Sequence, residues 1–154
     1  MRSLFVAAFT ALALAPNASA QPITGSYRLI SIAADYGDGS VVETFGKHPS
    51  GYAIITPKRF TVVLVAENRK AGTSPEEKLA LFGSQISYSG LYQIEGTRFI
   101  TQIDVSWNQV LTGTKQERNW MVEGNHLVFW TDKTPSVLDA SKITSTRTVW
   151  ERVE

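Results

Sequence analysis

The strongest constraint on this chain is a repeated pattern of short segments in which apolar and polar residues alternate, each followed by residues typical of turns. Alternation with a period of two places successive side chains on opposite faces of a β-strand. Many short strands separated by turns predict a β-sandwich or a β-barrel. The nine segments that we expect to form strands are 25–33, 41–45, 51–56, 59–66, 87–95, 98–107, 113–123, 126–132 and 146–153.

One segment departs from this alternation and predicts a single short α-helix over residues 75–85. Residues 74–77 (Ser-Pro-Glu-Glu) form a capping box, in which the Ser74 hydroxyl and the Glu77 carboxylate each accept from a backbone amide of the first turn. Proline is tolerated at the first helical position. Apolar residues then recur at helical spacing, at Leu79, Phe82 and Ile86.

The order of the segments predicts an all-β fold, a closed antiparallel up-and-down β-barrel with that one helix. Short turns such as Gly96-Thr97 and Gly124-Asn125 join consecutive segments and favour hairpins between neighbours. An open sheet of so many strands would leave exposed edges, and closing the sheet removes them.

Two long segments indicate which face of the barrel is polar. In 98–107 we expect one apolar face, formed by Phe99, Thr101, Ile103, Val105 and Trp107. In 113–123, Lys115 and Glu117 alternate with Gln116, Arg118 and Trp120. Charged residues on the outer face favour a soluble barrel over a membrane barrel, whose outer face is apolar.

The first twenty residues predict a signal peptide. Arg2 supplies a positive start, an apolar run of 12 residues follows (4–15), and the segment ends on Ala18-Ser19-Ala20. A membrane-spanning helix needs roughly 20 apolar residues, so removal after Ala20 is favoured over anchoring. We therefore expect secretion across the inner membrane, into a bacterial periplasm.

Charge and cysteine content exclude several classes of function. The chain has 15 Lys and Arg against 14 Asp and Glu, and loss of Arg2 leaves the mature chain formally neutral. Nucleic acids and anionic membranes require concentrated positive charge, so neither is an expected partner, and stable membrane insertion is not expected. The absence of cysteine excludes disulfides and thiolate chemistry.

Five short motifs follow one another across nearly the whole mature chain. They are 25–31 (GSYRLIS), Gly46 with Pro49, Gly51, Tyr52 and Thr56, then 88–92 (YSGLY), 113–118 (GTKQER) and 150–152 (WER). Their order and spacing resemble those of the bacterial and fungal lipocalin-like domain proteins. The resemblance implies that residues 21–154 form one lipocalin-like domain, a calycin-type barrel with a central cavity.

The resemblance also implies a range of activities. Some relatives of this architecture bind hydrophobic small molecules, and a few related barrels are isomerases or cyclases. This chain departs from the pattern in having Tyr27 where lipocalins carry Trp. It also lacks the histidines that many members show around Thr101 and Gln102, which weakens any chemistry assigned to them.

No constellation of residues predicts a catalytic or metal site. His48 and His126 are the two histidines, and both fall in turns or loops. A zinc site needs three or four converging ligands, and a hydrolase needs a base beside its nucleophile. Strand parity points Asp104 and Glu117 outward, against a glycosidase pair. We therefore assign no catalytic residue, no metal and no cofactor.

Aromatic residues on the predicted strands are the candidates for ligand contact, because aromatic rings build an apolar wall with polar handles. We assign ligand contact to Tyr27, Tyr52, Tyr88, Tyr92, Trp107, Arg118, Trp120 and Trp130. Arg118 has two interpretations. It is a clasp that closes the barrel end with Trp150 or Glu151, or it anchors a carboxylate or another polar head of a ligand.

Three functions follow from these observations. The first is a secreted protein that binds a small hydrophobic or amphipathic molecule. The second is an isomerase or cyclase that acts on an apolar substrate in the same cavity. The third is an interaction protein whose barrel is filled by side chains, as in many small barrels. Nothing in the sequence indicates an oligomeric state.

Overall fold

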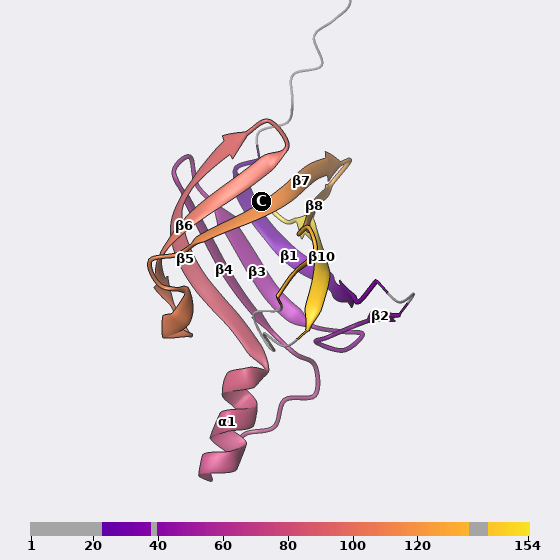
Figure 1. Cartoon of the computed structure of the whole chain (residues 1–154), viewed down its shortest axis with the longest axis vertical. Coiled ribbons are helices and arrows are strands. Elements are labelled where there is room, and N and C mark those ends of the chain that lie inside the picture. The colour runs from indigo at the N-terminus through magenta and orange to yellow at the C-terminus, as the bar shows by residue number, and fades with distance from the viewer. Residues whose placement is uncertain (1–22, 38–39, 136–141) are drawn as a thin grey trace, which may run out of the picture.

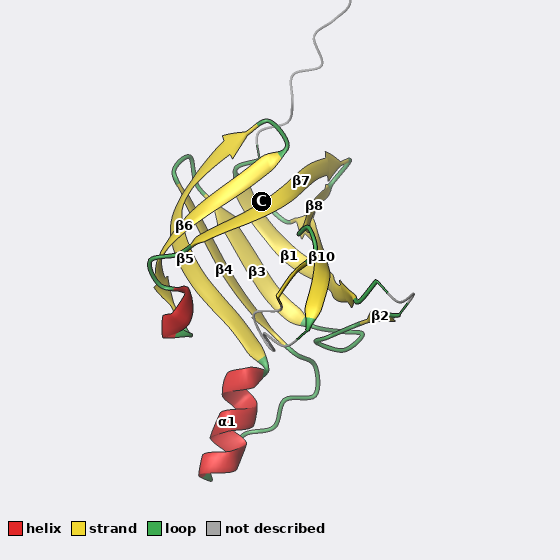
Figure 2. Cartoon of the chain, viewed as in Figure 1, coloured by secondary structure: helices red, strands yellow, loops and turns green. Residues whose placement is uncertain are grey.

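The structure is a computed structural model of the chain, and it describes residues 23–37, 40–135 and 142–154. The signal peptide predicted for residues 1–20 lies outside the described residues. Strands account for most of the described chain (Figure 2).

Eight antiparallel strands form a closed barrel, so the predicted fold class is confirmed. Each strand pairs with its neighbours along the chain, and β1 closes the barrel by pairing with β10 (Figure 1). The strands of the barrel are β1 (Gly25–Asp35), β3 (Ser50–Ile55), β4 (Arg59–Val65), β5 (Gln85–Glu95), β6 (Arg98–Ser106), β7 (Lys115–Glu123), β8 (His126–Trp130) and β10 (Ile143–Arg152).

Two strands of two residues extend the sheet, β2 (Val41–Val42) beside β1 and β9 (Thr134–Pro135) beside β10. The strand predicted at 41–45 is therefore much shorter than expected. The turns predicted at Gly96-Thr97 and Gly124-Asn125 close the hairpins β5–β6 and β7–β8, and both glycines have positive φ (58° and 59°). This backbone conformation is accessible to glycine at little steric cost.

The helix α1 (Pro75–Gly83) forms as predicted, but it ends two residues earlier. The Ser74 hydroxyl accepts from the Glu77 amide (3.2 Å), and the Glu77 carboxylate accepts from the Ser74 amide (3.0 Å). Ile86 belongs to β5 rather than to the helix, and its side chain faces the barrel interior. The helix has no buried residue and extends from the barrel end opposite the C-terminus (Figure 1).

A bulge in β6 makes one predicted face wrong. Ser89 pairs with Val105, whereas Gly90 pairs with Ile103, so Asp104 is an extra residue in β6. This insertion moves Val105 to the outer face, where it is 58% exposed, and breaks the apolar face predicted for 98–107. At Gly90, a Cβ atom would collide with the Gln102 carbonyl oxygen, so this close approach requires glycine.

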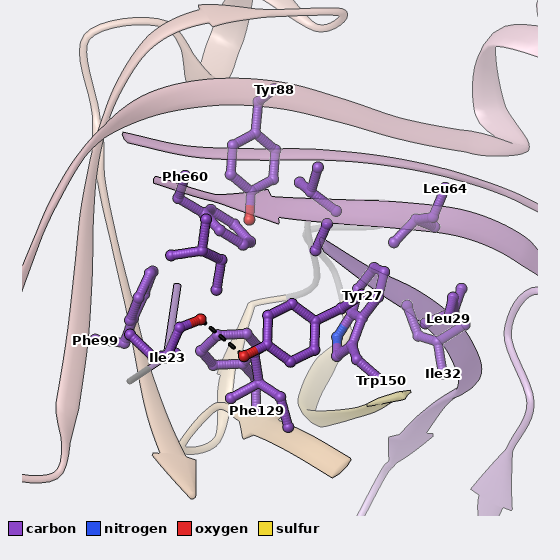
Figure 3. Packing of buried hydrophobic residues seen from close by; sticks show 14 of the residues in the cluster. Ile23, Tyr27, Leu29, Ile32, Phe60, Leu64, Tyr88, Phe99, Phe129 and Trp150 are labelled. Atoms are coloured by element: carbon purple, nitrogen blue, oxygen red, sulfur yellow. Dashed lines mark hydrogen bonds between the residues drawn. The ribbon is translucent and has the colours of Figure 1, made fainter. Parts of the chain in front are cut away.

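Aromatic rings fill the half of the barrel near the C-terminus, and Figure 3 shows Phe60, Phe99 and Phe129 packed together there. Phe99 stacks on Tyr92, with ring centroids 4.6 Å apart, and meets Phe60 and Phe129 edge-on at 5.2 and 5.0 Å. We call these four residues the aromatic plug. Edge-on and stacked contacts of this kind add to the hydrophobic stabilisation of the buried rings.

A set of contacts that we call the cationic clasp joins Arg152, at the end of β10, to Thr24 and Tyr27, at the start of the described chain. The Arg152 guanidinium lies 4.9 Å from the Tyr27 ring centroid and donates to the Tyr27 hydroxyl and the Thr24 carbonyl (2.7 Å each). The Tyr27 hydroxyl in turn donates to the Ile23 carbonyl (2.8 Å). The clasp expected of Arg118 is therefore made by Arg152, the last residue of β10.

Candidate functional site

The other half of the barrel contains a cavity of about 490 Å³. It lies toward the connections that carry α1 and the segment 131–135, because Leu64, Ile86 and Thr144 are among the residues that line it. This volume is within the range of small-molecule sites, about 300–1,000 Å³. The barrel interior is thus filled in one half and hollow in the other.

One wall of the cavity is apolar. It is built from inward-facing residues of three strands, because alternate residues of a strand share a face. These residues are Ile32 of β1, Phe60, Val62 and Leu64 of β4, and Ile86 of β5. Phe129 and Trp150 complete the lining near the plug.

A second wall is rich in hydroxyl groups. Thr144, Thr146 and Thr148 alternate along the inner face of β10, and Thr131 and Thr134 follow β8. The Thr148 hydroxyl accepts from the Trp150 indole (2.8 Å), and the Thr131 hydroxyl accepts from the Thr146 amide (2.9 Å). A hydroxyl that accepts one hydrogen bond can still donate its own proton. This wall can therefore bind polar groups along the edge of a ligand.

Among the described residues, the strand pairing of the barrel is incomplete beside the cavity. β7 pairs with β8 from Asn119 to Glu123, and no described strand pairs with the preceding residues 115–118 on that side. Lys115 and Glu117 are exposed and border the cavity here, together with residues of 131–135. We call this gap the lateral opening.

Asp132 holds the edge of the lateral opening. Its carboxylate accepts from Arg98 (2.7 Å) and from Asn119 (3.1 Å), and these bonds lower the pKa of Asp132 below its usual value. The bonds fix the segment after β8 against β6 and β7.

Arg118 lies on the inner face of β7 and lines the cavity. Its Nη1 atom is buried and has no hydrogen-bond acceptor in the described part of the chain. The guanidinium carbon lies 5.7 Å from the ring centroid of Tyr88. Burial raises the pKa of the Tyr88 phenol above its usual value, and the Arg118 charge offsets part of the increase.

The structure brings two of the predicted contact residues, Tyr88 and Arg118, together in the cavity lining. Tyr92 belongs to the aromatic plug, and Trp120 packs against the core. Tyr27 belongs to the clasp. These three residues face inward, but they lie outside the cavity lining.

The three other predicted contact residues are also outside the cavity lining. Tyr52 is on the outer face of β3 and 55% exposed, because Ala53 and Ile55 occupy the inner face. Trp130 alternates with the inward-facing Phe129 and also points outward. Trp107 follows β6, where its indole donates to the Phe82 carbonyl of α1 (3.2 Å).

The hydroxyl-rich wall of the cavity was not among the predicted contact residues. Its signal is the regular spacing of Thr144, Thr146, Thr148 and Trp150, which is the alternation of a strand with one face of hydroxyls. The sequence predicts a strand that begins at residue 146 and favours aromatic residues as ligand contacts, so it does not point to the small polar side chains on the inner face of β10.

The described residues include no group of three or more His, Cys, Asp or Glu side chains that could hold a metal ion. His48 and His126 are outside the cavity lining. Asp104 is on the outer face and accepts from Arg59 (2.7 and 2.9 Å), which lowers the pKa of this carboxyl. None of the helices in the described residues is long and apolar enough to cross a membrane.

Comparison with known proteins gives one result that assigns the chain to a family. No curated protein matches the sequence significantly. The model of a lipocalin-like domain matches residues 24–153, which include every strand of the barrel. The chain therefore belongs to the lipocalin-like domain family.

Proposed function

We propose that this protein binds a small hydrophobic or amphipathic molecule in the hollow half of its barrel. The observation that carries the proposal is the cavity of about 490 Å³, with an apolar wall on one side and a hydroxyl-rich wall on the other. A mostly apolar pocket with a few placed polar groups is typical of small-molecule sites. The lipocalin-like fold supports the same function.

Binding is favoured over isomerase or cyclase chemistry by the groups that line the cavity. A general base needs a pKa close to the working pH. The pKa of Asp132 is lowered by its ion pair with Arg98, and the pKa of Tyr88 is raised by burial. Both shifts move these groups away from neutrality, so neither is tuned as a base.

The filled-core function is disfavoured because only one half of the interior is filled. The plug packs the end near the C-terminus, whereas the cavity separates β4 and β5 from β10 in the other half. A cavity lowers stability because packing contacts are lost, and an interaction protein with a filled core does not require one.

The proposal includes export of the protein to the periplasm after cleavage behind Ala20. The predicted signal peptide supports this location. Mass spectrometry of the protein recovered from a periplasmic fraction tests it, with Gln21 expected as the first residue. An intact Met1 or Arg2 in the native protein contradicts it.

Binding is tested by titrating the purified protein with Nile red, a neutral apolar dye, and by native mass spectrometry of protein from its source. Two substitutions on β4 form a matched pair, because Val62 lines the cavity and Val63 points outward. Val62→Phe is expected to fill part of the cavity and weaken dye binding at least about tenfold, whereas Val63→Phe leaves it unchanged.

Circular dichroism and melting curves serve as the control that tests whether both variants are folded. Equal dye affinity for the two folded variants contradicts binding in the cavity. Absence of dye binding, of a retained molecule and of any ligand-linked rise in melting temperature contradicts the proposed function.

A further inference from the structure

The cavity contains a cation that the rest of the described structure does not compensate. Arg118 Nη1 is buried without an acceptor. Burying a polar group without a hydrogen bond is unfavourable, and for a charged group the penalty is larger. A ligand acceptor that bonds to such an atom therefore gains more binding free energy than one that bonds to an exposed donor.

Arg118 is also the one orphaned group that a ligand can reach. Three buried side-chain atoms lack a partner among the described residues, namely Thr101 Oγ1, Arg118 Nη1 and Trp120 Nε1. Neither Thr101 nor Trp120 lines the cavity, whereas Arg118 does.

The carboxylates of the cavity lining do not neutralise Arg118. Asp132 is committed to Arg98 and Asn119. Glu117 adjoins Arg118 in sequence, so it points to the opposite face of β7, where it is exposed. The described lining contains three cationic residues and two carboxylates, so its formal net charge is +1. The cationic residues are Arg98, Lys115 and Arg118.

Tyr88 adds a second donor beside this charge. Its hydroxyl points into the barrel interior (Figure 3), and the guanidinium of Arg118 lies over its ring. Because burial raises the pKa of Tyr88, the phenol is protonated at neutral pH and can donate. Two neighbouring donors, one of them charged, favour an anionic acceptor over a cation or a hydrocarbon.

We infer that the ligand is an amphiphile with a single acidic head, bound at Arg118 beside Tyr88. Its apolar body lies along Val62, Leu64 and Ile86, which line the cavity on β4 and β5. Arg118 is the last residue of β7 before its pairing with β8 begins, so the head lies at the lateral opening. This inference rests on the proposed function and specifies the chemical class of its ligand.

The test compares three probes of equal chain length, dodecanoic acid, methyl dodecanoate and dodecylamine, as competitors of Nile red. The wild-type protein is expected to bind the acid at least about tenfold more tightly than the ester, because a charge-assisted hydrogen bond is lost in the ester. The amine is expected to bind more weakly than the ester, since Arg118 repels it.

Arg118→Met and Arg147→Met form the matched pair of variants. Each removes one positive charge from the barrel, but Arg147 is on the exposed outer face of β10 and outside the cavity lining, whereas Arg118 lines the cavity. We expect Arg118→Met to remove the preference for the acid while the ester affinity stays within about twofold, and Arg147→Met to keep the preference.

The outcomes separate this inference from the proposed function. If all probes fail to bind, the proposed function fails. If the ester binds the wild type as tightly as the acid does, or if Arg118→Met retains the preference for the acid, binding stands and the acidic head is wrong. A melting curve of each variant shows that it is folded, and Arg118→Lys is expected to restore part of the preference.

Discussion

The two halves of the barrel are built from the same strands, yet one is packed and the other is hollow. On β4, Phe60 belongs to the aromatic plug where the plug borders the cavity, whereas Val62 and Leu64, farther along the same inner face, are outside the plug and line the cavity. On β10, Trp150 is followed toward the open half by Thr148, Thr146 and Thr144. The size of the inward side chains, not the course of the backbone, determines where the barrel is empty.

The largest contrast is expected from truncating the plug. Phe99 is fully buried and contacts the three other rings of the plug. Phe99→Ala is expected to lower the free energy of unfolding by about 3–5 kcal/mol, because it removes apolar contacts and leaves a void. Urea unfolding monitored by circular dichroism measures this loss. A loss below about 1 kcal/mol would show that the plug does not hold the barrel together.

The reverse substitution sharpens the comparison. Ala53 is fully buried in the core, whereas Thr146 faces the cavity. Ala53→Leu is expected to cost about 1–3 kcal/mol through overpacking, and Thr146→Leu to change the unfolding free energy by less than about 1 kcal/mol. Equal losses in the two variants would mean that the hollow half is as tightly packed as the core around Ala53.

Each half also contains one inward-facing arginine, and the two differ in their partners. Arg152 donates to Thr24 and Tyr27 and lies over the Tyr27 ring. Arg152→Met is therefore expected to lose about 1–2 kcal/mol of stability. Arg118→Met, which removes a buried charge without an acceptor, is expected to keep or increase stability. Chemical denaturation of both variants without ligand decides the comparison, and a greater loss for Arg118→Met would contradict it.

The smallest effect is expected at the outer surface, which both halves share. Arg59 lowers the pKa of Asp104, so the pair stabilises the folded state above the ordinary carboxyl pKa of 3.8, and this contribution is lost as the pH falls through the lowered value. Asp104→Asn should therefore reduce the melting temperature slightly at pH 7, and the difference from the wild type should shrink as the pH falls below 3.8. A difference that persists at low pH would assign the effect to something other than this ion pair.

Much of the fold could be predicted from the sequence, because alternation, turn glycines and the capping box at Ser74 act locally. The bulge at Asp104 has no such local signal, and its insertion moved Val105 to the outer face. For the site, Tyr88 and Arg118 were predicted from residue type and parity. Tyr52 and Trp130 were chosen for their rings, although the parity of their own strands places them outside.

The clasp between Arg152 and Tyr27 has a consequence for how the chain acquires its structure. Thr24 and Arg152, which it joins, are 128 residues apart in sequence. During synthesis β1 cannot gain its partner β10 until β10 itself has been made, so a nascent chain that ends before β10 has an unpaired strand edge at each end of its sheet. Barrel closure is thus a long-range step, and the loss of residues 150–152 removes the clasp and part of the seam together.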